Sequence, residues 1–203
     1  MKIIFFLTLL LIQFHAYGQK QDEMLSIAAG PSFHGSGDMP GLNFNFEYRK
    51  YFRKKIYYAI DIAGNIHNDQ FYLFYTTPDG MDQDGSVRTT VAGLQLGGGI
   101  GYNLIRTNHH DLSFKTSAFY RYQSSSLYDV ITVLFEPATG LPFPVVILQH
   151  KEAQKKFSPG INLQLSYRYS VSKKYSIGMY GSFQFDFNED NIMNAGLSIG
   201  RRF

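Results

Sequence analysis

Eight charged residues share one phase of a repeated alternation between polar and apolar side chains. They are Glu47, Arg49, Asp61, Lys115, Arg121, Arg168, Asp186 and Arg202. Charges enclosed on the inner face of a closed sheet form either a charge-paired gate in a narrow pore or a plug that conducts nothing. We predict a plug, because a closed sheet of about eight strands is only wide enough to be filled by side chains.

Glu47 and Asp61 lie on either side of a short turn at residues 52–55. On adjacent antiparallel strands they would therefore stand nearly opposite each other. Two carboxylates in a confined space disfavour joint ionisation unless cations lie between them. Lys115, Arg168 and Arg202 have the same phase at a similar depth, so we expect them to be the partners of this pair.

Candidate metal and catalytic sites are weak. An acidic segment partly matches a calcium-binding loop through Asp79, Asp82 and Asp84. Val91 stands where that loop requires a glutamate, so a solvated acidic loop is the better interpretation. His109 and His110 are adjacent, and on a strand they would point in opposite directions and bind one metal poorly. The sequence predicts no cofactor, no metal site and no catalytic residue.

The inward charges belong to segments in which apolar side chains occupy every second position. The clearest segment runs from Tyr175 to Phe187, and the alternation recurs at 25–29, 42–49, 60–66, 94–102, 112–122, 161–169 and 195–203. A period of two is typical of β-strands with one apolar face. The sequence therefore predicts about eight strands, most of them near the ten or so residues that a tilted strand needs to cross a bilayer.

The connections between these segments differ in length. Residues 52–55 and 170–173 form short turns, whereas 34–40, 67–87 and 123–156 are longer. Short turns at one end and long loops at the other are typical of a transmembrane barrel. An even number of strands places both termini at the end with the short turns.

Composition favours an apolar outer face in lipid over a soluble barrel with an apolar core. Charged residues make up only 17% of the chain and aromatic residues 16%, and the polar phase is rich in Gly, Ser and Asn. Tyrosines gather near strand ends, as an interfacial girdle requires: Tyr48, Tyr51, Tyr102, Tyr167, Tyr169 and Tyr175. The net charge of +3 does not indicate a nucleic-acid partner, and without cysteine there is no disulfide or thiolate site.

The first 18 residues have the pattern of a signal peptide. A basic Lys2 precedes an apolar run of about ten residues, and small residues follow at Ala16 and Gly18. The run is too short for a membrane-spanning helix. We therefore predict cleavage between Gly18 and Gln19, which leaves 19–203 as one barrel domain.

The alternating strands and the final segment 196–203, which closes on Phe203, resemble the small eight-stranded outer-membrane β-barrel proteins of Gram-negative bacteria. The resemblance implies an integral, porin-like protein of the outer membrane and cell envelope, with both termini in the periplasm. It implies contact with outer-membrane lipid and lipopolysaccharide. It also implies recognition of Phe203 by the barrel-assembly machinery. The family includes structural barrels, surface-interaction proteins, narrow pores and lipid-A enzymes, so it predicts location better than activity.

The third long loop carries two β-branched apolar runs around a Pro/Gly turn, which predicts a hairpin within 128–150. Three arrangements are open: an extension beyond the membrane that presents a sheet edge to a partner, a loop folded over the barrel mouth, or two extra strands that give a ten-stranded barrel. An extracellular protein or ligand would bind through the apolar side chains Tyr128, Val130, Val133, Phe135, Phe143, Val146 and Leu148.

The function predicted from these observations is structural or surface-interacting, with no enzymatic activity. The first alternative is a narrow passive channel. The second is a lipid-A-modifying enzyme, and enzymes of that kind place His and Ser two residues apart on a lipid-facing strand. We assign no such pair from the sequence.

Overall fold

The computed structural model describes residues 23–35, 39–72, 74–76, 80–84, 86–126, 130–134, 139–142, 145–149, 153–187 and 190–203. The predicted signal peptide, residues 1–18, lies outside this set. Within the described ranges, no helix has the length and apolarity needed to cross a membrane.

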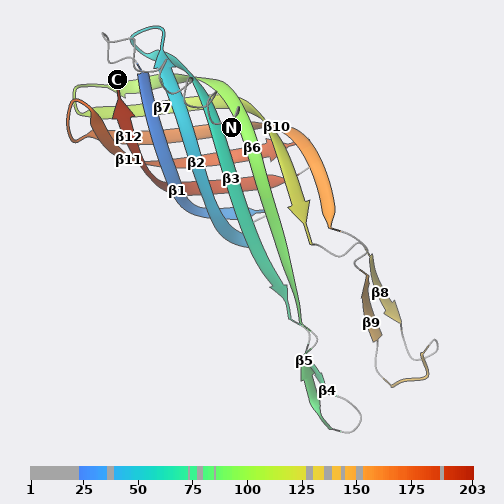
Figure 1. Cartoon of the computed structure of the whole chain (residues 1–203). Helices are drawn as coiled ribbons and strands as arrows, with labels where there is room; N and C mark the ends of the chain where they lie inside the picture. The colour runs from blue at the N-terminus through green and yellow to red at the C-terminus, as the bar shows by residue number, and fades with distance from the viewer. Residues whose placement is uncertain are drawn as a thin grey trace, which may run out of the picture.

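Eight antiparallel strands close into a barrel, which confirms the predicted fold class. They are β1 (Glu23–His34), β2 (Met39–Tyr51), β3 (Ile56–Phe71), β6 (Val87–Arg106), β7 (His110–Ser125), β10 (Gln154–Ser170), β11 (Tyr175–Asp186) and β12 (Asn191–Arg202). Each strand pairs with its neighbours in the chain, and β1 pairs with β12 to close the sheet (Figure 1). Closure leaves no sheet edge within the wall, as a barrel in hydrocarbon requires.

The predicted alternation sets the two faces of the wall. Along β7, Phe114, Tyr120 and Tyr122 are exposed on the outside, whereas Lys115 and Arg121 are buried inside. The same arrangement holds around the barrel, so the outer surface is apolar and the interior polar. Leu197 is 71% exposed and Leu42 65%. A continuous apolar surface of this kind is stable in contact with acyl chains and not in water.

The two ends of the barrel differ, and we call them the turn end and the loop end. The turn end carries the connections 52–55, 107–109 and 171–174 together with Glu23 and Arg202. At the loop end, the predicted loop at 34–40 is shorter than expected. β1 continues to His34 and β2 begins at Met39, because Gly35 adopts a φ of 70° that lets the chain turn sharply.

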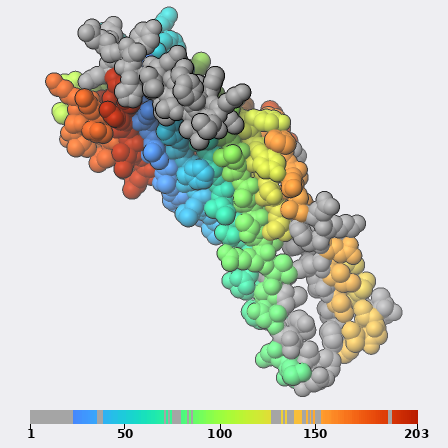
Figure 2. All heavy atoms as spheres, viewed as in Figure 1, coloured from blue at the N-terminus to red at the C-terminus, as the bar shows by residue number. Residues whose placement is uncertain are grey.

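The wall is taller on one side at the loop end. The strands β3, β6, β7 and β10 have 16 to 20 residues, against 12 or 13 for the other four. Beyond them stand two separate hairpins, β4 (Phe74–Thr76) with β5 (Asp82–Asp84), and β8 (Val130–Leu134) with β9 (Val145–Gln149). Both hairpins form narrow projections beyond the body of the barrel (Figure 2).

The hairpin predicted within 128–150 is therefore present, and the ten-stranded alternative is wrong. β8 and β9 pair only with each other and contribute nothing to the closed sheet. Their apolar runs do not alternate, so they lack the polar inner face that a barrel strand needs. Of the two remaining arrangements, the structure shows an extension away from the barrel rather than a loop folded over its mouth (Figure 1).

Candidate functional site

Glu47 is the centre of a buried group of charges in the turn half of the barrel. It accepts hydrogen bonds from Lys115 Nζ at 2.7 Å, from Arg168 Nη2 at 3.0 Å and from Arg49 Nη2 at 3.1 Å. Lys115 Nζ also donates to Asp61 Oδ1 at 3.0 Å. We call Glu47, Arg49, Asp61, Lys115 and Arg168 the Glu47 cluster. Each of its five side chains is at most 4% exposed.

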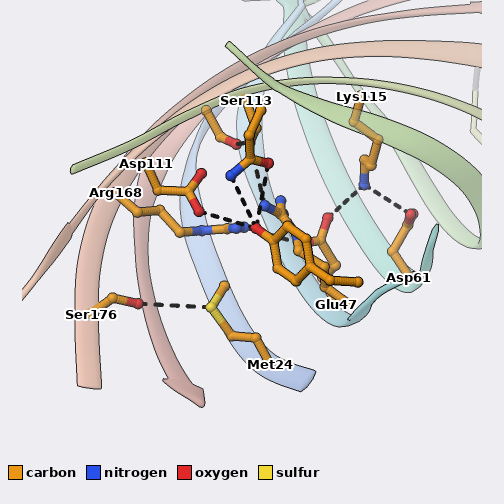
Figure 3. A network of polar contacts seen from close by, with 12 residues as sticks. Met24, Glu47, Asp61, Asp111, Ser113, Lys115, Arg168 and Ser176 are labelled. Atoms are coloured by element: carbon orange, nitrogen blue, oxygen red, sulfur yellow. Dashed lines mark hydrogen bonds and ion pairs between the residues drawn. The ribbon is translucent and has the colours of Figure 1, made fainter. Parts of the chain in front are cut away.

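The Glu47 cluster joins opposite walls of the barrel (Figure 3). Glu47 and Asp61 are direct register partners on β2 and β3, as the short turn between them predicts. Lys115 reaches them from β7, and Arg168 from β10, which lies four places from β2 around the closed sheet. These ion pairs therefore cross the lumen.

Arg202 does not belong to this cluster, contrary to the sequence-based expectation. It is only partly buried, and none of the ion pairs between described residues includes it. Met24, the register neighbour of both Arg202 and Arg49, places a buried apolar side chain at this end of the interior. The third cation on Glu47 is instead Arg49, two residues along the same strand, whose guanidinium also lies 3.8 Å from the centre of the Tyr57 ring.

A second charged group lies in the loop half. Arg121 Nη2 contacts Asp186 and lies 3.8 Å from Asp190 Oδ2. Gln123 donates to Asp190 at 3.2 Å, and His34 Nε2 is 3.8 Å from Asp190 Oδ1. The contact with His34 holds the pKa of the Asp190 carboxyl below its ordinary value. These contacts hold Asp190, the residue before β12, at the barrel mouth.

Sequence reasoning missed two acidic residues that lie beside these groups. Asp190 lies between strands, where alternation assigns no phase. Asp111 is buried and accepts a hydrogen bond from Tyr51 Oη at 3.0 Å. It shares the inward phase of Lys115, so extending the alternation to the start of β7 would have found it.

Little space remains between the two charged groups. One interior cavity, lined mainly by amide side chains including Asn65, Gln95 and Asn162, has a volume of about 20 Å³. Another, beside Glu47 and Arg168, has about 10 Å³. Each admits about one water molecule. Between the described residues around these two cavities, side chains therefore fill the interior, as the narrow width of an eight-stranded barrel predicts.

Two His–Ser arrangements bear on the enzyme alternative. Ser32 Oγ and His67 Nε2 are 2.7 Å apart, but both side chains are fully buried inside the barrel and face away from lipid. A His-x-Ser sequence does occur, at His34–Ser36, so the prediction that the chain has none is wrong. The His34 side chain also points inward, toward Asp190, and Ser36 lies outside the described residues. Neither arrangement places a His–Ser pair of described residues on the lipid-facing surface.

Only some of the predicted partner-binding residues lie among the described residues. Tyr128, Phe135 and Phe143 lie outside the described residues. Val130 and Val133 belong to β8, and Val146 and Leu148 to β9, by their backbone.

The acidic segment before β6 belongs to the β4–β5 hairpin. Asp82 and Asp84 are exposed on β5, and Asp79 lies outside the described residues. Hydrogen bonds from Ser86 lower the pKa of Asp84. Across the described part of the chain, no group of three His, Cys, Asp or Glu residues is arranged to hold a metal ion.

Comparison with known proteins finds solved structures with the same fold. No protein-family model matches the sequence, and the search of curated proteins gives no match. Among solved structures, Neisserial surface protein A (NspA) is 10% identical with a TM-score of 0.59, covering 92% of this chain and 100% of its own. Ail, the attachment invasion locus protein of Yersinia pestis, solved with the heparin analogue sucrose octasulfate, is 11% identical with a TM-score of 0.50. That match covers 89% of this chain and 97% of Ail.

At this level of identity the likeness concerns the fold and does not extend to ligands. What this chain shares with these neighbours is the closed antiparallel barrel. The chain has the fold of the small eight-stranded outer-membrane β-barrels.

Proposed function

We propose that this protein is an integral barrel of the outer membrane that acts at the cell surface through the structures projecting from its loop end. Its interior is a plug and its role is non-enzymatic. In this proposal residues 1–18 are removed as a signal peptide, the turn end with both termini faces the periplasm, and Phe203 is recognised by the barrel-assembly machinery.

The observation that carries the proposal is the unequal height of the wall. A barrel that only spans the membrane gains nothing from four strands that continue beyond it, whereas a surface for a partner requires such an extension. Residues 155–158 of β10 pair with β7 but have no register partner among the described residues of β11, whose pairing begins at Gly160 with Asp186. An open strand edge beside a projecting hairpin suits the addition of a strand from a partner.

Charge differs between the two sides of the loop end. Lys155 and Lys156 are exposed at the start of β10, beside the segment that carries β8 and β9, whereas Asp82 and Asp84 are exposed on β5. In the solved complex Ail holds a sulfated heparin analogue. By analogy, the lysine-bearing side is where an extracellular ligand of this protein would bind, and outer-membrane lipopolysaccharide would surround the apolar wall.

The plug predicts that the folded protein does not conduct ions as an open porin does. In planar lipid bilayers we expect no stepwise conductance above that of the protein-free membrane, because side chains fill the lumen. An open porin inserted under the same conditions is the positive control. Steady unitary currents that scale with salt concentration would show the narrow-channel alternative to be correct.

The surface role predicts that the β8–β9 hairpin can be removed without loss of the barrel. Replacing residues 128–150 with a short Gly-Ser linker should leave the heat-dependent gel migration of the folded barrel unchanged, because β8 and β9 pair only with each other. The same variant should no longer retain the proteins that the immobilised intact protein captures from culture medium, as identified by mass spectrometry.

The matched control removes the other hairpin, residues 74–84, with the same linker. We expect it to retain the captured proteins. Equal capture by the intact protein and the 128–150 variant would contradict a binding role for this hairpin.

A further inference from the structure

The turn end carries a cleft whose residues combine cationic and apolar side chains. Its volume is about 630 Å³, and its walls are Tyr51, Phe52, Arg53, Lys54, Lys55, Arg106, Thr107 and Asn108. A volume of this size falls within the usual range for small-molecule sites. Three cations come from the β2–β3 turn and the fourth from the end of β6.

These cations have no acidic partners in the described structure. None of the ion pairs between described residues includes Arg53, Lys54, Lys55 or Arg106. The turns 52–55, 107–109 and 171–174 contain no Asp or Glu. Asp111, the register partner of Arg106, is buried and accepts a hydrogen bond from Tyr51, and it does not line the cleft. The cleft is therefore lined by positive charges alone and attracts anions.

Arg106 is held in place on one side of the cleft. Its Nη1 donates to the Lys54 carbonyl at 2.5 Å, and its guanidinium carbon lies 3.8 Å from the centre of the Tyr51 ring. The backbone N–H of Asn103 donates to the backbone carbonyl of Lys55 at 2.8 Å, which fixes the turn against β6. An arginine held in this way presents its remaining N–H groups with little loss of side-chain entropy, as bidentate phosphate binding requires.

A β-bulge gives the same region an apolar surface toward lipid. Pairing between β6 and β7 shifts register between Asn103 and Ile105, so the alternation breaks there. As a result the consecutive residues Leu104 and Ile105 are both exposed, by 50% and 48%. Phe52, on the facing turn, is 56% exposed. Apolar side chains thus stand next to unpaired cations at the membrane boundary.

We propose that this cleft binds an anionic glycerophospholipid, with the phosphate between Arg106 and the Lys54–Lys55 turn and the acyl chains along Leu104, Ile105 and Phe52. The site rests on the proposed membrane insertion. A free anion would need only the cations, and an apolar molecule only the bulge. A lipid that carries both a phosphate and acyl chains matches the cleft together with the adjoining apolar residues of the bulge.

The test is native mass spectrometry of the folded full-length protein in nonionic detergent. The protein is titrated with phosphatidylglycerol and with phosphatidylcholine of the same acyl composition. We expect phosphatidylglycerol to bind about tenfold more tightly. The Lys54→Gln/Lys55→Gln variant and, separately, Arg106→Gln should each remove most of that preference.

The matched control is Lys173→Gln/Lys174→Gln, which removes the same charge from the β10–β11 turn, outside the cleft. We expect it to change the affinity for phosphatidylglycerol less than about twofold. Equal affinity of the intact protein for the two lipids would overturn the proposal. A loss of phosphatidylglycerol affinity in the control as large as in the cleft variants would do the same. Displacement of the lipid by a 10-fold excess of inorganic phosphate would also overturn the proposal, because the acyl chains would then add nothing to the affinity.

Heat-dependent gel migration of each variant establishes that it is folded before titration. A protein that fails to insert into bilayers at all would contradict the proposed function. A folded, inserted barrel without lipid preference would contradict the cleft alone.

Discussion

Glu47→Gln is expected to lower the free energy of unfolding of the barrel by about 3–5 kcal/mol. The substitution preserves the shape of the side chain but removes the negative charge on which Arg49, Lys115 and Arg168 converge. When one member of a buried ion pair is neutralised, the charge of the other member stays buried without a counter-charge. Here three cations each lose their contact with the Glu47 carboxylate. Asp61 still contacts Lys115, which leaves the two arginines as the uncompensated charges.

The measurement is the folded fraction across a urea series in lipid vesicles, read from the gel migration of unheated samples. The chain has no tryptophan, so this readout replaces indole fluorescence. Glu23→Gln is the matched control, because Glu23 pairs with Lys50 at 2.7 Å at the partly exposed rim. An exposed pair contributes about 0–1 kcal/mol. If Glu47→Gln cost no more than Glu23→Gln, the interior charges would be solvated and the plug would be wrong.

Leu96→Arg should destabilise the inserted barrel by about 2–4 kcal/mol. Leu96 is 59% exposed on the outer face near the middle of β6, where its register partners are Ile62 and Tyr120. In a membrane this position lies in hydrocarbon, where an arginine loses its hydration. In a soluble barrel the same exposed position would accept an arginine at almost no cost.

The comparison variant is Val171→Arg, in the β10–β11 turn, where the side chain is 62% exposed. We expect it to cost about 0–1 kcal/mol, because the turn lies at the interface with water. Both variants are measured by the same urea series in vesicles. Equal and small effects at the two positions would mean that the apolar face does not contact acyl chains.

Much of the fold could be predicted because a strand sends successive side chains to opposite faces. The alternation over 112–122 or 175–187 therefore assigns each residue to lipid or to the interior, and the register of Glu47 with Asp61 follows from one short turn. The prediction was weaker wherever alternation stops. It gave no phase to Asp190, it overestimated the loop at 34–40, and it left open whether β8 and β9 join the wall.

The choice among inward charges could not be made from the sequence. Arg202 and Arg168 have the same phase and a similar depth, yet only Arg168 reaches Glu47. The β-bulge beside Asn103 was also not predicted, because the alternation was followed only to Tyr102 and the consecutive apolar residues Leu104 and Ile105 do not by themselves distinguish a bulge from the end of a strand. It is this bulge that turns Ile105 outward, beside Leu104 and the Lys54–Lys55 turn.

The amino-acid sequence by itself determined that the chain forms a barrel with a polar interior, because periodicity is a local property of each strand. Only the tertiary structure decided which charges meet, since the partners of Glu47 come from β7 and β10 on other parts of the wall. Their distances depend on how the tilted strands close around the lumen, and closure is a property of the whole sheet.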